Sequence, residues 1–118
     1  MIYSIVITGS LPTRLNQLVG CHWGQAGRLK GRDKEQVARA IRAYEVPPAQ
    51  HKRRIDVLLV LPKGTRTGDR DNWMKSLLDA LKQAKALYDD SPNWCEWKPP
   101  RFARGEDAET IITIEDLL

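Results

Sequence analysis

The feature that most restricts the fold of this chain is a helical pattern in residues 72–87. The segment contains neither Gly nor Pro, and its apolar side chains recur at three- and four-residue spacing. They are Met74, Leu77, Leu78, Leu81 and Ala84. This spacing gathers the apolar side chains on one face of a helix, and that face has to pack against another element. The segment therefore predicts an amphipathic core helix, for which Asp71 is well placed as the N-cap.

A second helix is expected earlier in the chain, over residues 32–45. Apolar residues at helical spacing support it, Asp33 can serve as its N-cap, and Pro47 and Pro48 end it. The preceding residues 9–31 are rich in glycine, which costs about 1 kcal/mol per residue in a helix interior. These residues are therefore expected to form a loop.

Four segments have the character of β-strands. Residues 2–8 and 55–61 are rich in β-branched residues and Leu, as in strands that are buried in a sheet. Residues 94–98 and 108–114 are further strand candidates near the C-terminus. The chain between these last two segments, residues 99–105, contains two prolines and a glycine and is expected to form a hairpin loop.

The interleaved order of strands and helices predicts the α/β (α+β) class. With 118 residues, of which 42% are hydrophobic, the chain is long enough for one domain with a core and too short for two comfortable ones. We therefore expect a single domain over residues 1–118. Its predicted order is β-α-β-α-β-β, with one small mixed sheet flanked by helices.

The charge of the chain is unevenly distributed. Residues 1–68 contain 12 Lys and Arg against 4 Asp and Glu, a balance of +8, whereas residues 69–118 contain 7 against 11, a balance of −4. A basic segment favours a polyanionic partner, because each neutralised phosphate releases condensed counterions. A basic surface exposed only to solvent is the alternative, so charge alone makes nucleic acid a candidate partner without deciding it.

The sequence also predicts a cytoplasmic protein without disulfides. The longest apolar run, residues 57–61, is far shorter than the ~20 residues that span a bilayer, so no contact with a membrane is expected. The N-terminal residues 1–8 lack the basic region of a signal peptide and are predicted as a strand. Cys21 and Cys95 have no partners at metal-ligand spacing, which argues against a zinc site.

Acidic residues before and after the 72–87 helix are candidates for metal binding. Asp69 and Asp71 lie two residues apart at a loop-to-helix junction, where both side chains can point toward one space. Magnesium binds one or two carboxylates together with waters and substrate phosphate. Asp90 is a third candidate, although a straight helix would place it ~25 Å away. It can join the others only if the chain turns back or a second subunit supplies it.

Each of these acidic residues also has a structural interpretation. Asp71 can be a helix N-cap, or it can form an ordinary i,i+4 ion pair with Lys75 worth a few tenths of a kcal/mol. Asp89 and Asp90 can be turn residues. Since an isolated Asp-x-Asp motif is weak, the residues alone leave metal binding and capping open.

A longer pattern in this region resembles the RusA family of Holliday junction resolvases. The family pattern is Asp-x-Asp-Asn-x-x-Lys-x-x-x-Asp-Ala-Leu, followed by a helix end and Asp-Asp. Every position of it is filled without a gap, by Asp69, Asp71, Asn72, Lys75, Asp79, Ala80, Leu81, Asp89 and Asp90. Residues 11–16 and 109–114 are more weakly similar to the family's first loop and closing strand.

The resemblance implies a dimeric, metal-dependent endonuclease that resolves Holliday junctions, four-way branched DNA, in recombination and repair. Carried over by position, Asp69, Asp71 and Asp90 are the catalytic carboxylates that hold Mg²⁺ or Mn²⁺, and Lys75 is the basic catalytic helper. Asp79 matches as well but is expected to be structural. A homodimer would present the site twice for two symmetric phosphodiester cuts. The protein would act in the cytoplasm of a bacterial cell and be encoded by the cell or by a phage.

The junction is expected to lie across basic residues of both subunits. The candidates are Arg14, Arg28, Lys30, Arg53, Arg54, Arg66 and Arg70. The chain departs from the family pattern in residues 20–31, which are richer in glycine, and at Pro99 and Pro100, which interrupt the expected third strand. Two alternatives remain open, a non-catalytic DNA-binding protein that assists recombination and a nuclease for other branched DNA.

Overall fold

The computed structural model describes residues 1–14 and 23–118, with the side chains of residues 23–26 and 30 left aside. The elements are β1 (Ile2–Thr8), α2 (Trp23–Ala43), β2 (Lys52–Leu61), the 3₁₀ helix η1 (Arg70–Trp73), α3 (Lys75–Gln83), β3 (Cys95–Trp97), β4 (Arg101–Arg104) and β5 (Glu109–Leu117). The chain is thus a single α+β domain with a mixed sheet, as the sequence predicts.

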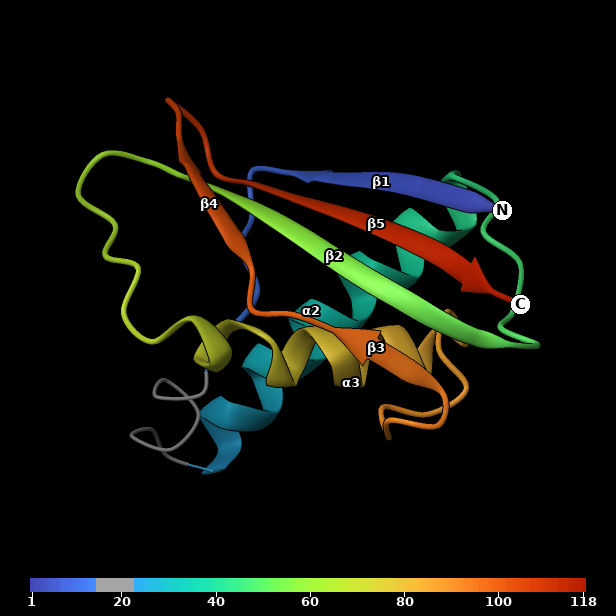
Figure 1. The fold of residues 1–118 in the computed structure, drawn as a ribbon. Coiled ribbons are helices and arrows are strands. Elements are labelled where there is room, and N and C mark those ends of the chain that lie inside the picture. The colour runs from blue at the N-terminus through green and yellow to red at the C-terminus, as the bar shows by residue number, and fades with distance from the viewer. Residues whose placement is uncertain (15–22) are drawn as a thin grey trace.

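The sheet has β5 and β2 at its centre, in the order β1-β5-β2-β3 (Figure 1). β5 pairs antiparallel with both β1 and β2. β3 and β4 both pair parallel with β2, β3 along its first half and β4 along its second. They therefore act as one edge strand that is interrupted at residues 98–100.

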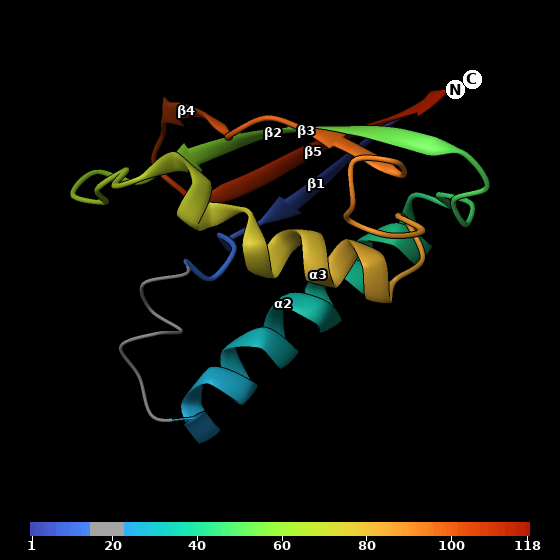
Figure 2. The same cartoon turned by 60° about the horizontal axis from the view of Figure 1, so that its bottom comes forward.

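Both helices cover the same face of the sheet, and the opposite face is left open by the described residues (Figure 2). Side chains of β2 alternate strictly between buried and partly exposed, and β5 follows the same pattern through its first six residues. The buried set packs against the apolar faces of α2 and α3. The largest members of this core include Ile5, Ile55, Leu59, Leu81 and Ile112. A sheet covered on one face is typical of the α+β class.

Several boundaries differ from the sequence-based expectation. α2 begins at Trp23, well before residue 32, and so includes Gly27 and Gly31. The cost of these glycines is offset because a helix that is already formed extends at little cost, and the second half of α2 is packed on the core. α3 ends at Gln83, earlier than predicted. The expected hairpin loop after β3 instead contains β4, because the edge of β2 offers backbone partners there.

Asp33 is not an N-cap, since α2 begins ten residues before it; it is a buried link between three segments. Its side chain is 3% exposed. Its Oδ2 accepts hydrogen bonds from the backbone N–H of Thr13 at 2.8 Å and from the Ser76 hydroxyl at 2.6 Å. A buried carboxylate is tolerated when such donors satisfy it. Asp33 thereby ties the loop after β1 and the first turn of α3 to the middle of α2.

No helix in the described ranges has both the length and the apolar content that crossing a bilayer requires.

Candidate functional site

Asp69 and Asp71 lie at the start of η1, and neither acts as a side-chain cap. Asp69 precedes η1 and its side chain makes no capping hydrogen bond. Asp71 lies inside η1, and Met74 occupies the N-cap position of α3, so the predicted capping role of Asp71 is wrong. Both residues are exposed. Within residues 1–14 and 23–118, neither carboxylate has a hydrogen bond or ion pair, and both are therefore available to a ligand.

The loop that carries Asp69, residues 62–69, is anchored by two side chains from outside it. The guanidinium of Arg104 donates to the carbonyl oxygens of Pro62 at 3.2 Å and of Thr65 at 2.5 Å. The indole N–H of Trp73 donates to the carbonyl oxygen of Thr67 at 2.7 Å. These bonds hold the loop against β4 and η1. The sequence did not single out Arg104, because it was assigned to a hairpin loop.

Aromatic rings beside this loop are covered by arginines. The guanidinium of Arg14 lies 5.0 Å from the centroid of the Trp73 ring, and that of Arg70 lies 5.6 Å from the Phe102 ring. The two rings meet edge to face at a centroid distance of 6.3 Å. Stacking on an aromatic face orients a guanidinium. Two of the basic residues predicted to contact DNA are therefore placed at the same end of the molecule as Asp69.

Lys75 is the first residue of α3 and is exposed. The ion pair with Asp71 that the sequence offered as a structural alternative does not form between these two described residues. The ammonium group is therefore not neutralised by that carboxylate and stays available beside η1.

Asp89 and Asp90 lie in the loop after α3, at the opposite end of that helix from η1 (Figures 1 and 2). Asp89 accepts a contact from the ammonium group of Lys82 at 2.9 Å. This hydrogen bond, with help from Ser91, lowers the pKa of Asp89 from 3.8 to about 2. Asp90 is exposed and has no such partner in the described chain. Of the carboxylates of Asp89 and Asp90, only that of Asp90 is without an ion pair to the described residues, and it is therefore the better candidate to bind a ligand.

The three predicted metal ligands do not meet within one chain. Among the residues that the structure describes, no group of three His, Cys, Asp or Glu side chains is placed to hold a metal ion. Asp69 and Asp71 stand at one end of α3, and Asp90 stands beyond the other. A centre that uses all three would need a second copy of the chain.

No protein-family model matches the chain, and no curated protein sequence matches it either. The likeness to the RusA family thus rests on the sequence pattern, chiefly that of residues 69–90.

One residue that was predicted to contact DNA, Arg53, is buried in the structure. Its side chain is only 2% exposed, and Nε donates to Asp116 at 2.7 Å. Nη1 donates to the carbonyl oxygens of Pro47 at 2.9 Å and Ala86 at 3.0 Å. Tyr3 covers the guanidinium at 5.5 Å. Because these groups enclose Arg53, it stabilises the fold and does not face a DNA strand.

The other predicted DNA contacts differ in how accessible they are. Arg28 on α2 and Arg66 in the 62–69 loop are exposed. Arg54 is partly exposed on the open face of the sheet, where Glu96 and Glu115 lie 3.5 and 3.3 Å away. The side chain of Lys30 lies outside the described part of the structure. Arg66 and Arg70, which are close to or within η1 in sequence, and Arg14, which stacks on Trp73 of η1, therefore remain predicted contacts near η1.

The Asp89–Lys82 contact predicts a measurable pKa. Because the pKa of folded Asp89 is depressed, the contact stabilises the fold above pH 3.8, and this stabilisation is lost as pH falls toward 2. In Lys82→Met the pKa of Asp89 should rise toward 3.8, which carboxyl-detected NMR titration measures. The Lys85→Met variant removes a nearby charge without this hydrogen bond and serves as the control. An unchanged Asp89 pKa in Lys82→Met would contradict the assignment.

Proposed function

We propose that this protein is a metal-dependent endonuclease for branched DNA, similar to the RusA resolvases, and that Holliday junctions are its substrate. The observation that carries the proposal is the exposed pair Asp69 and Asp71, which lies where an anchored loop meets η1 and forms no ion pair with the described residues. Two exposed carboxylates this close in sequence can both reach one cation, and oxygen ligands of this kind suit Mg²⁺ or Mn²⁺. The spacing of Lys75 and Asp90 from this pair follows the family pattern.

The proposed metal ligands are Asp69, Asp71 and Asp90. When bound, Mg²⁺ would acidify a water molecule and neutralise charge that develops on the phosphate. Lys75, one turn after Asp71, would place a point charge near the leaving oxygen. Arg14, Arg66 and Arg70 would neutralise neighbouring phosphates and hold the strand at η1.

We further propose that Asp90 reaches this site from a second copy of the chain. Asp90 lies beyond the far end of α3 from Asp71, so a homodimer with two-fold symmetry would bring each Asp90 to the partner's η1. Such a dimer would hold two equivalent sites, as two symmetric cuts in a junction require.

The test is incubation of the purified protein with an end-labelled four-way junction, in Mg²⁺ or in EDTA. Paired nicks in opposite strands, seen only with the metal, are the expected result. A Y-shaped flap of the same sequence shows whether cleavage is confined to junctions. If the junction is bound in Mg²⁺ but stays uncut, the proposed catalysis is overturned and the protein is a non-catalytic DNA-binding protein. The observation that favours this alternative is the separation of Asp90 from Asp71 within one chain.

A further inference from the structure

A polar cleft opens between the loop after β1, α2 and the 62–69 loop. Its lining includes Ser10, Pro12, Arg14, Arg32, Thr65 and Trp73. No Asp or Glu is among the described residues that line it. Arg14 and Arg32, which come from different segments of the chain, thus place two guanidinium groups at the cleft.

Arg32 is held in place but keeps donors for a ligand. Its Nη2 contacts the hydroxyl of Thr13 at 3.2 Å and the carbonyl oxygen of Leu11 at 3.4 Å. The same nitrogen lies 3.4 Å from Asp33. Nε and Nη1 make no hydrogen bond to the described part of the chain, and the side chain is 48% exposed. Arg32 was not among the DNA contacts predicted from the sequence.

Trp73 also lines the cleft, and the guanidinium of Arg14 lies 5.0 Å from the centroid of its ring. Trp73 is 2% exposed, and its indole N–H is bonded to Thr67. The ring is thus fixed, and Arg14 is oriented along one face of it. Planar guanidinium groups in fixed positions match the oxygens of a phosphate better than mobile lysines do.

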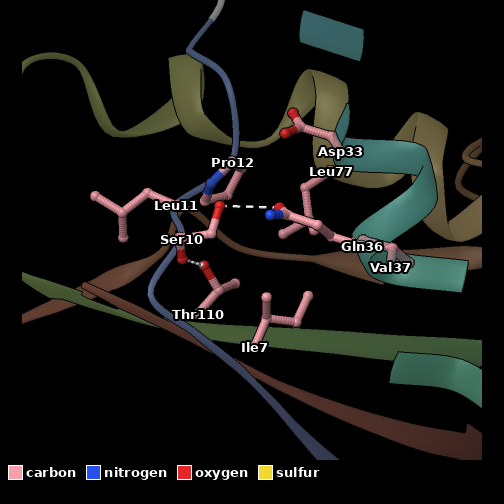
Figure 3. Close-up of a pocket in the computed structure, with 9 residues that line it drawn as sticks. All are labelled: Ile7, Ser10, Leu11, Pro12, Asp33, Gln36, Val37, Leu77 and Thr110. Carbon is pink, nitrogen blue, oxygen red and sulfur yellow. Dashed lines mark hydrogen bonds between the residues drawn. The ribbon is translucent and has the colours of Figure 1, made fainter. Parts of the chain in front are cut away.

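The loop after β1, which lines the cleft, is also fixed by hydrogen bonds to the rest of the domain. The N–H of Gly9 donates to the carbonyl oxygen of Ala108 at 2.7 Å, and the Thr110 hydroxyl donates to that of Ser10 at 2.9 Å. The Ser10 hydroxyl donates to Gln36 at 2.9 Å, and Figure 3 shows Ser10 between these partners. A cleft with such walls is formed before a ligand arrives, so less ordering entropy is lost on binding.

We propose that this cleft binds a backbone phosphate of the DNA substrate, with the unused donors of Arg32 as its ligand. The inference rests on the proposed function for the choice of DNA. Trp73 in the wall and Asp71 belong to the same short helix η1. A strand anchored by a phosphate in the cleft would therefore continue past the Asp69–Asp71 pair, which is where cleavage is proposed.

Thr65→Glu tests the cleft without removing any of these contacts. Thr65 lines the cleft, and it is the backbone carbonyl of Thr65 that binds Arg104. A carboxylate there should repel a phosphate. Binding of a fluorescent four-way junction is measured by anisotropy in EDTA over a series of salt concentrations. We expect Thr65→Glu to bind about tenfold more weakly than the neutral Thr65→Gln, with a salt slope lower by about 1.

Two arginine variants complete the test. Arg32→Gln should lower the affinity and the salt slope as Thr65→Glu does. Arg39→Gln removes the same charge two turns further along α2, where Arg39 pairs with Glu35 at 2.9 Å, and should leave the slope nearly unchanged. Thermal unfolding shows that the variants are folded.

Because the binding assay contains no metal, its outcome is separate from that of the cleavage assay. If Thr65→Glu and Thr65→Gln bind with the same affinity and slope, the cleft proposal is overturned even where the wild type cuts junctions. If Thr65→Glu weakens binding while the wild type never cuts, the cleft proposal stands and the nuclease proposal falls.

Discussion

Mixing the Asp71→Asn and Asp90→Asn variants is expected to restore junction cleavage that neither variant shows alone. Each single variant should lose at least about 100-fold in cleavage rate, since even groups that only support a metal ligand cost 10–100-fold. In a mixed dimer with sites shared between chains, one site lacks both carboxylates and the other keeps both. If the two variant chains pair at random, half of the dimers are mixed, so about a quarter of all sites in the mixture are intact.

The measurement is cleavage of the labelled junction after the two variants have been unfolded together and refolded. A mixed dimer has one working site, so single nicks should dominate over paired cuts. The matched control is a mixture of Asp69→Asn and Asp71→Asn. These two carboxylates flank the same turn of one chain, and every site would lack one of them, so no activity should return. Absence of recovery in the Asp71–Asp90 mixture would contradict a site built from two chains.

Replacing Arg53 by Met should lower the free energy of unfolding by about 3–5 kcal/mol, the usual cost of removing one partner of a buried ion pair. Asp116, whose side chain is 14% exposed, would keep its charge without the 2.7 Å contact. The carbonyl oxygens of Pro47 and Ala86 would lose their donor as well. Urea unfolding followed by circular dichroism gives the change, as a lower midpoint at an unchanged slope.

Arg54→Met is the matched control for Arg53→Met. Arg54 is the next residue of β2, but its side chain is 39% exposed, and its two ion pairs lie on the open face of the sheet. Exposed pairs contribute about 0–1 kcal/mol, so this variant should unfold close to the wild type. Equal losses in the two variants would show that Arg53 has no special structural role.

Part of the proposed site could be recognised from local sequence, and part could not. Asp69, Asp71 and Lys75 are close in sequence, so their shared location at the start of α3 follows from chain connectivity alone. Arg14, Arg32 and Trp73 come from separate segments, and only the packing of α2 against β1 and α3 brings them to one cleft. Trp73 had no distinguishing signal, because a buried core tryptophan has the same local pattern.

The sequence by itself determined the elements whose periodicity is local, which are β1, the core of β2, the apolar face of α3 and hence the α+β class. Tertiary structure decided the partners of charged residues. Arg53 and Asp33 are charged residues of the kind that usually lies at the surface. Both are buried because distant segments form hydrogen bonds with them. The separation of Asp90 from Asp71, in contrast, was expected from the sequence, because a helix lies between them. Local pattern reports which face of an element is apolar, whereas burial of a charge depends on contacts between residues far apart in the chain.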